Sequence, residues 1–263
     1  MIDSVLIIDD NEDILEFLSE VLSDTYTVYI AESGEKAQEI LATKTVSLIV
    51  SDIMMPGIDG FELCALLKSD VAYCHIPIIL LTAKNTQNAF IEGLEVGADA
   101  YVQKPFSPEL LQLHIANLLK NRMKIKVHFS SSPFEDFRVN AQSKTEEAFL
   151  KKLSDYIQKN LNDPHLDIDN LADYMNMSRP TFYRKIKSIS SLSPKELIDT
   201  TRVKSAARLI GEDLYRFSEI ARIVGYNTPG LFSRNFKKYF KMTPIEYRNS
   251  LHKKQTGSAP VEQ

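Results

Sequence analysis

Three short runs of almost wholly apolar residues place the strongest constraint on how the first 120 residues fold. They lie at residues 5–8, 47–50 and 78–81, and such runs are typical of strands that are covered on both faces of a parallel sheet. Two further runs of apolar or β-branched residues, at residues 27–30 and 100–103, bring the predicted strands to five. Stretches with a helical period lie between and after them, at residues 12–23, 34–43, 61–69, 87–96 and 108–120. Five such units predict an α/β fold with a doubly wound parallel sheet.

Polar side chains stand where four of these predicted strands end. Asp9 and Asp10 follow the first strand, Asp52 follows the third, Thr82 ends the fourth and Lys104 follows the fifth. A lone aspartate after a strand is usually a helix cap. In an open α/β sheet, however, ligands bind outside the carboxyl ends of the strands. Five polar groups at four strand ends therefore indicate one functional crevice.

The residue types in this crevice limit its chemistry. Three neighbouring carboxylates need a cation, or one of them must be neutral. Oxygen ligands without histidine or cysteine suit Mg²⁺, which takes one or two carboxylates, water and phosphate oxygens. A lysine and a hydroxyl facing the same point can bind the remaining oxygens of a phosphoryl group.

The segments around these side chains resemble the receiver domain of response regulators. They are residues 6–11 (LIIDDN), 51–60 (SDIMMPGIDG), 81–83 (LTA) and 101–106 (YVQKPF), and the resemblance covers residues 1–120. It implies the strand order 2-1-3-4-5, a cis bond between Lys104 and Pro105, and phosphorylation of Asp52. It also implies that Asp10 and Asp52 bind Mg²⁺ directly, with Asp9 acting through water and the backbone carbonyl of Met54 as a further ligand.

The same resemblance implies a switch. Thr82 and Lys104 would hold the phosphoryl group, and Tyr101 would turn inward as Thr82 moves toward the new charge. The face formed by the fourth helix, the fifth strand and the fifth helix would then change, and receivers usually dimerise on that face.

A metal-dependent phosphohydrolase with an aspartate nucleophile is the enzyme alternative. Enzymes that resemble haloacid dehalogenases need a second acid two residues after the nucleophile, and that position holds Met54. The sequence therefore predicts a chain that accepts and slowly loses its own phosphoryl group and has no separate substrate.

The net charge of −4 conceals two halves of opposite sign. Residues 1–120 hold 6 lysines and no arginine against 19 acidic residues, a balance of −13. Residues 144–254 hold 21 basic against 13 acidic residues, a balance of +8. A basic half suits a polyanion such as DNA. There is no apolar run of about 18 residues for a membrane span and no signal peptide pattern. The two cysteines predict buried, reduced thiols.

These patterns predict four segments. They are a receiver at residues 1–122, a linker at 123–143, a basic helical domain at 144–251 and a disordered tail at 252–263. The linker interpretation rests on the lack of a helical period after residue 122 and on the turn chemistry of residues 130–133 (SSSP).

The basic half contains a repeat with a period of about 50 residues. Residues 171–175, 182–187 and 193–196 correspond to residues 220–224, 232–237 and 243–246. Each repeat predicts two short helices joined by a turn, and the second helix has an apolar face opposite a basic one. This is the layout of a helix-turn-helix, whose second helix enters the major groove. A connecting helix over residues 194–210, stopped by Gly211, would span about 26 Å. A helical bundle with a basic surface is the alternative.

Residues 150–249 resemble the AraC/XylS-type DNA-binding domain, through residues 220–226 (IARIVGY) and 232–237 (FSRNFK). In the first repeat the resemblance implies base-facing Arg179, Pro180, Tyr183 and Arg184, with Lys187 on the same basic face. In the second repeat the corresponding residues are Pro229, Gly230, Ser233 and Arg234, with Lys237. Because Pro229 and Gly230 replace the polar residues often found there, we expect the second repeat to contact mainly the DNA backbone and to read few bases.

Together the halves predict a two-component response regulator in the cytoplasm. A sensor histidine kinase would phosphorylate Asp52 and so control binding to double-stranded promoter DNA, through a phosphorylation-dependent homodimer that can contact RNA polymerase. The domain pairing resembles the carboxyl part of hybrid two-component proteins, so the kinase would act in trans or from the same membrane-anchored chain. An RNA-binding antiterminator and a protein-binding adaptor are the alternatives.

Overall fold

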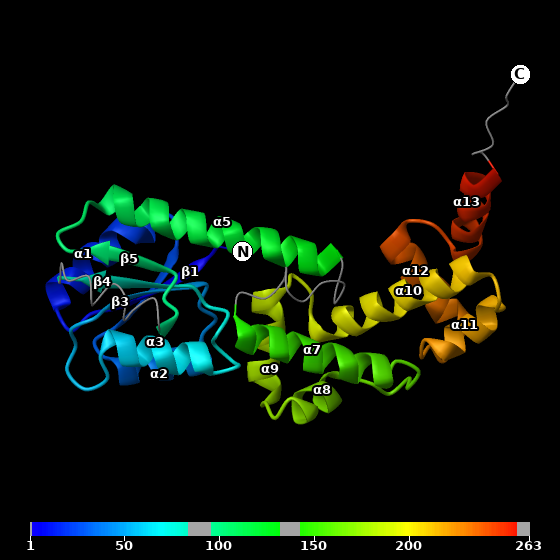
Figure 1. The fold of residues 1–263 in the computed structure, drawn as a ribbon, viewed down its shortest axis with the longest axis horizontal. Helices are drawn as coiled ribbons and strands as arrows, with labels where there is room; N and C mark the ends of the chain where they lie inside the picture. The colour runs from blue at the N-terminus through cyan, green and yellow to red at the C-terminus, as the bar shows by residue number, and fades with distance from the viewer. Residues whose placement is uncertain (1, 84–95, 132–142, 257–263) are drawn as a thin grey trace, which may run out of the picture. The chain divides into compact units, whose positions relative to one another are not determined.

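The computed structural model describes residues 2–83, 96–131 and 143–256 (Figure 1). The chain divides into two compact units. The first contains Met1–Lys151 together with Pro180–Ser191, and the second contains Lys152–Arg179 together with Leu192–Gln263. The helix predicted at residues 87–96 lies outside the described residues except for Val96, and so does most of the predicted tail.

The first unit is built on a five-stranded parallel sheet. Its strands are β1 (Ser4–Ile8), β2 (Thr27–Ala31), β3 (Leu48–Asp52), β4 (Ile78–Thr82) and β5 (Ala100–Gln103). They pair in the order β2-β1-β3-β4-β5, which confirms the predicted topology. The three inner strands, β1, β3 and β4, are buried at every residue, which is why their sequences are apolar almost throughout.

Helices cover both faces of this sheet (Figure 1). On one face α1 (Glu12–Ser23) and α5 (Pro108–Ser131) pack Leu18 and Ile115 against Ile7 of β1. On the other face α2 (Gly34–Thr43) and α3 (Gly60–Ser69) pack their own apolar residues against Leu6. The alternation of side chains along a strand sends Leu6 and Ile7 to opposite faces, so two separate cores form.

The helix α5 is longer than the sequence predicted. We expected a helix only to residue 120 and a linker from residue 123, but α5 continues to Ser131. Arg122 and Phe129 lie two turns apart on one buried face of the extension. Arg122 pairs with Glu146 of α7 (Lys144–Lys159) at 3.0 Å, and both side chains are at most 5% exposed. The apolar pattern missed this helix because one of its buried positions is an arginine.

The second unit is helical. It holds α8 (Ile168–Tyr174), α10 (Pro194–Glu212), α11 (Phe217–Ile223), α12 (Pro229–Phe240) and α13 (Pro244–Thr256), while α9 (Arg179–Ile189) belongs almost entirely to the first unit. One core joins α10, α11 and α12, and it includes Val203, Ile220 and Phe232. The predicted helix–turn–helix segments, α8–α9 and α11–α12, are both present in the secondary structure.

The connecting helix α10 does not stop at Gly211 as predicted. It runs to Glu212, and Asp213 then adopts the left-handed conformation, with a φ of 52°. A glycine inside a helix is unfavourable by only about 1 kcal/mol relative to alanine. The helix can therefore include Gly211 and end one residue later, at Glu212. The predicted capping boxes are confirmed, with Ser193 and Glu196 at the start of α10 and Thr243 and Glu246 at the start of α13.

Within the part of the chain that the structure describes, no helix is long and apolar enough to cross a membrane.

Gly225, in the turn between α11 and α12, is a position that only glycine suits. Its φ is +81°, and an added Cβ would lie 2.2 Å from the carbonyl oxygen of Leu161. We predict that Gly225→Ala destabilises the helical unit by at least about 2 kcal/mol, because strain at a positive φ adds to a clash with backbone. Urea unfolding followed by circular dichroism measures this change.

Gly230 provides the matched control. It lies in the first turn of α12, and an added Cβ would meet nothing within 4 Å. Gly230→Ala should leave the urea concentration at the midpoint of unfolding unchanged or raise it, since alanine favours the helix. Equal loss of stability in both variants would contradict the role assigned to Gly225.

Candidate functional site

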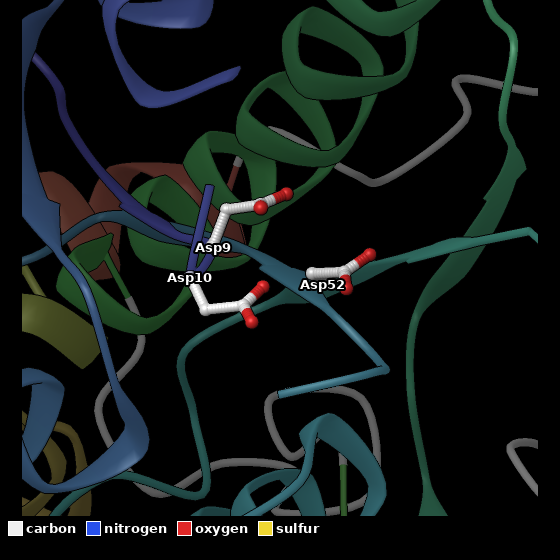
Figure 2. A group of neighbouring side chains, drawn as sticks. All are labelled: Asp9, Asp10 and Asp52. Atoms are coloured by element: carbon white, nitrogen blue, oxygen red, sulfur yellow. The ribbon is translucent and has the colours of Figure 1, made fainter. Parts of the chain in front are cut away.

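Three carboxylates meet at the carboxyl edge of the sheet (Figure 2). Asp9 and Asp10 follow β1, and Asp52 is the last residue of the neighbouring strand β3. One oxygen from each carboxylate lies within 4.8 Å of the others. Asp9 and Asp52 are buried while Asp10 is exposed, so the cluster opens to solvent on the Asp10 side.

Lys104 closes the cluster from the edge strand β5. Its Nζ lies 2.7 Å from Oδ1 of Asp52 and 2.8 Å from Oδ2 of Asp9. The backbone N–H of Lys104 donates to the carbonyl of Thr82 at 2.7 Å, and the bond to Pro105 is cis, as predicted. These contacts hold one ammonium group between two carboxylates that come from different strands.

The charges in this cluster do not balance. Three carboxylates face one ammonium group, so ionisation of all three leaves a net negative crevice. Burial raises the pKa of Asp52 above its usual value, although the hydrogen bond from Lys104 opposes this effect. Burial also acts to lower the pKa of Lys104, but the hydrogen bonds to Asp52 and Asp9 outweigh it and the net pKa is raised. Lys104 therefore stays charged, and ionised Asp52 is incompletely compensated.

Backbone contacts fix where Asp52 points. Its Oδ2 accepts a hydrogen bond of 3.0 Å from the N–H of Met54, while Oδ1 faces Lys104. The start of α3 presses against the same segment, because an added Cβ on Gly60 would lie 2.2 Å from the carbonyl oxygen of Asp52. Only glycine at this position allows α3 to begin so close to β3.

Thr82 and Tyr101 come from the neighbouring strands β4 and β5. Leu81 pairs with Asp52 in the sheet register, so the next residue, Thr82, stands at the same edge as the carboxylates. Thr82 is buried. Tyr101, on the neighbouring strand, is partly buried and packs against the core beneath α2 and α3. The three carboxylates, Thr82 and Lys104 therefore come from the same edge of the sheet, whereas Tyr101 pairs with Leu80 further back along β4.

The two predicted recognition helices differ. On α12, Phe232 and Phe236 are buried. Its predicted DNA-facing residues are exposed, except for the partly buried Ser233; the exposed ones are Pro229, Gly230, Arg234 and Lys237. The amphipathic pattern predicted for this helix is thus observed.

On α9 the basic face is partly covered. Arg179, Pro180 and Tyr183 are exposed, and Arg179 pairs with Asp169 at 3.3 Å. Arg184 and Lys187 are only partly buried, but their neighbour Lys185 is 1% exposed. The sequence placed Arg184 and Lys187 on a basic face of this helix, and it made no prediction for Lys185.

A signal for Lys185 was nevertheless present in the sequence. Lys185 comes three residues after the buried Phe182, and positions three apart share a helix face. Cys74 and His75, which lie against it, had no pattern that marked them.

Comparison with known proteins identifies two domains in the chain. Residues 5–116 match the response regulator receiver domain, and residues 171–250 match a helix-turn-helix domain. The chain is a receiver domain joined to a helix-turn-helix domain. The second match agrees with the AraC/XylS-type domain expected at residues 150–249.

Relatives contain the same parts in longer proteins. Over 246 residues the chain is 35% identical to histidine kinase P4 of Formosa agariphila, a match covering 94% of this chain and 18% of that protein. The phosphate regulon transcriptional regulatory protein PhoB of Pseudomonas aeruginosa is 40% identical over 118 residues, which are 44% of this chain and 52% of PhoB. The solved receiver domain of a histidine kinase from Syntrophus aciditrophicus is 34% identical, covering 45% of this chain and 90% of that one, with a TM-score of 0.43. The chain thus spans about half or less of these two curated relatives.

The charge imbalance of the receiver site predicts the effect of neutralising Asp52. Since the folded protein raises the pKa of Asp52, ionisation at pH 7 is unfavourable to folding. With a chelator present to remove divalent cations, Asp52→Asn should raise the thermal midpoint by about 2 °C. This corresponds to less than about 1 kcal/mol for a unit of this size, because solvent reaches part of the site.

The difference in thermal midpoint between Asp52→Asn and the wild type should be largest at neutral pH. It should vanish below the ordinary carboxyl pKa, where wild-type Asp52 is protonated in both the folded and the unfolded state. Asp70→Asn is the control, because Asp70 is exposed and an amide oxygen can also accept the hydrogen bond from Ala72. A thermal midpoint of Asp52→Asn below that of the wild type would contradict this prediction. It would mean that the attraction between ionised Asp52 and Lys104 stabilises the fold by more than the burial of the Asp52 charge destabilises it.

Proposed function

We propose that this chain is a phosphorylation-controlled transcription regulator in which Asp52 is the phosphoacceptor. One observation supports this above the others: Lys104 joins Asp52 and Asp9 in an open carboxylate cluster, on a chain that also contains an exposed basic recognition helix. In this proposal the receiver occupies residues 1–122 and the DNA-binding domain residues 144–251.

The carboxylates fit a divalent cation that prefers oxygen ligands. Asp10 and Asp52 would bind Mg²⁺ directly, Asp9 would act through water, and the carbonyl of Met54 would add a ligand. The solvent-facing position of Asp10 agrees with a metal that keeps several waters. Bound Mg²⁺ would neutralise charge on the incoming phosphoryl group.

The chain's own residues would perform the transfer step as follows. Oδ2 of Asp52 accepts the N–H of Met54, and Oδ1 is the oxygen that would attack phosphorus once Lys104 shifts toward the phosphoryl group. The new O–P bond of the acyl phosphate would form as the P–N bond to the phosphohistidine of the donor kinase breaks, and the imidazole would leave with the electron pair of that bond. Lys104 and Thr82 would then each bind a phosphoryl oxygen. Because Thr82 and Tyr101 are on adjacent strands, movement of Thr82 would let Tyr101 turn further inward.

We propose a sensor histidine kinase as the phosphodonor, in trans or on the same natural chain, and cytoplasmic promoter DNA as the target. The extended match to a protein named histidine kinase P4 supports this choice of partner. A phosphorylation-dependent homodimer and contact with RNA polymerase complete the proposal. No turnover of a separate substrate is part of it.

Phosphorylation gives a direct test. Incubation with acetyl phosphate and Mg²⁺ should add the mass of one phosphoryl group to the wild-type chain, because Asp52 is the carboxylate held by both Lys104 and the N–H of Met54. Asp52→Asn should add none, and removal of Mg²⁺ by a chelator should prevent labelling of the wild type. Intact-mass spectrometry measures each result.

Asp70→Asn again serves as the control and should label like the wild type. Full labelling of Asp52→Asn would overturn the assignment of the phosphoacceptor. Labelling that persists without any divalent cation would overturn the assignment of the metal.

DNA binding gives an independent test. Arg234 is exposed on α12, so Arg234→Ala should weaken binding to duplex DNA and reduce the slope of log K against log salt by about 1. Lys36→Ala is the control, because it removes the same charge from the acidic half, where Lys36 pairs with Glu39. It should leave both the affinity for duplex DNA and the slope of log K against log salt unchanged.

Fluorescence anisotropy with a random-sequence 30-base-pair duplex at several salt concentrations measures these effects. A chain that prefers structured RNA in competition would favour the antiterminator alternative. A chain that binds neither nucleic acid would favour the adaptor.

A further inference from the structure

Arg202 of α10 is a buried cation in the helical unit, with 6% of its surface exposed. Its Nη2 donates to the backbone carbonyl of Asp163 at 2.5 Å, and its guanidinium carbon lies 5.7 Å from the centre of the Tyr226 ring. Its Nε has no hydrogen-bond partner within the residues that the structure describes. Burying a charge is costly unless it is fully paired, and apolar residues can often replace buried charges without loss of stability. The stability of the fold therefore does not account for an arginine at this position.

Arg202 connects two turns that are far apart in the sequence. Asp163 lies in the turn between α7 and α8, and Tyr226 lies in the turn between α11 and α12. A Cβ added to Gly225 would lie 3.0 Å from both Nε and Nη2 of Arg202 and 2.2 Å from the carbonyl oxygen of Leu161. The two turns therefore pack closely together, and the guanidinium group contacts both. All of these residues belong to the second compact unit.

The contact continues from Tyr226 to the second recognition helix, α12. Nδ2 of Asn235 on α12 lies 3.4 Å from the hydroxyl oxygen of Tyr226 and 3.4 Å from Oδ1 of Asp199 on α10. Burial raises the pKa of Tyr226 to about 12, so this hydroxyl keeps its proton at neutral pH. The apolar face of α12, with Phe232 and Phe236, packs on the core, but apolar packing is not directional. The polar contacts of Asn235 therefore define how α12 is rotated on α10.

The corresponding turn of the first repeat has the same backbone but different side chains. Asn176 and Met177 stand where the second repeat has Gly225 and Tyr226. Asn176 and Gly225 both have a positive φ, of 54° and 81°, and in each repeat the next residue donates its N–H to the alanine five residues earlier. A methionine has no ring face to offer to a cation. The contact of a ring with Arg202 is thus a feature of the second repeat.

We propose that Arg202 is a positioning residue for DNA binding, which holds α12 at one rotation on α10 through Tyr226 and Asn235. Because Arg202 is buried, it acts on DNA only through α12, whose exposed Arg234 and Lys237 would meet the phosphates. This inference rests on the proposed DNA-binding function and is independent of the phosphorylation of Asp52.

Arg202→Met tests this role, because it removes the guanidinium group and keeps a long side chain in the buried site. Asp163 is exposed, so water can replace the lost hydrogen bond to its carbonyl, and the thermal midpoint should change by less than about 3 °C. The affinity for the random-sequence 30-base-pair duplex should nevertheless fall about tenfold, since the cations of α12 no longer meet the phosphates together. Wild-type affinity in a folded Arg202→Met would overturn the proposal.

A double-mutant cycle shows whether Arg202 acts through α12. Arg234→Ala weakens DNA binding of the wild type, but in the Arg202→Met background it should weaken binding by less than about twofold, because α12 is already displaced from the phosphates. Residues that act independently have additive effects on the free energy of binding. Additive effects of Arg202→Met and Arg234→Ala would therefore overturn the positioning role.

Arg208→Met is the matched control. It removes the same charge from the same helix, but the Arg208 side chain is 75% exposed and its guanidinium group lies 3.9 Å from Glu212. Any effect of Arg208→Met on DNA affinity should add to that of Arg234→Ala. Equal coupling of Arg202 and Arg208 to Arg234 would mean that the loss of charge, and not the contact with Tyr226, is responsible, and this would overturn the proposal.

Hydrogen exchange supplies a readout that does not depend on DNA. In Arg202→Met the backbone amides of α12 should exchange about tenfold faster than in the wild type, while those of α10 stay protected. Unchanged protection of α12 would overturn the role of Arg202. If the wild type does not bind the duplex, the proposed DNA-binding function fails, and the exchange rates still decide whether Arg202 holds α12.

A second substitution covers the case in which Arg202→Met does not fold, as seen by loss of the circular dichroism signal of the helices. Arg202→Lys keeps the charge but lacks the planar fork of donors. It should show the same loss of coupling to Arg234 and the same faster exchange in α12. Additive effects and wild-type exchange in Arg202→Lys would overturn the proposal.

Discussion

The contact of one ammonium group, that of Lys104, with two buried carboxylates determines how the receiver site works. Asp9 follows β1, Asp52 ends β3 and Lys104 follows β5, so the contact forms only when the strand order brings these three ends to one edge. With Asp10 nearby, the site retains negative charge after Lys104 is counted. Any change of charge at Asp52 therefore acts first on Lys104, and from there on the strand that also holds Tyr101.

Two other buried cations connect the helices of the first unit, and their partners differ. Arg122 of α5 has a carboxylate partner, Glu146 of α7, within 3.0 Å. Lys185 of α9 lies against an imidazole and a sulfur, and neither is a carboxylate. The carboxylate of Glu146 also acts on Lys185, since its charge opposes the lowering of the Lys185 pKa by burial. One acidic side chain of α7 therefore influences both buried cations.

Much of the fold follows from local patterns in the sequence. The inner strands are apolar because both faces are covered, and the caps at Ser193 and Thr243 are local contacts. Errors arose where tertiary contacts outweighed local preference. Arg122 is buried by pairing with Glu146, so α5 continued where the apolar pattern ended. Gly211 did not end α10, but the helix ends only one residue later, at Glu212, because a single glycine disfavours a helix by only about 1 kcal/mol relative to alanine.

The sequence by itself determined the carboxylate cluster and the basic face of α12. Strand ends in a parallel sheet meet at one edge, and the side chains of a helix repeat with a fixed period, so spacing alone locates these groups. Only the tertiary structure decided that Lys104 contacts Asp9 and Asp52 together, and that Lys185 of α9 is buried. Such burial depends on which surface covers a helix, and residues far apart along the chain form that surface.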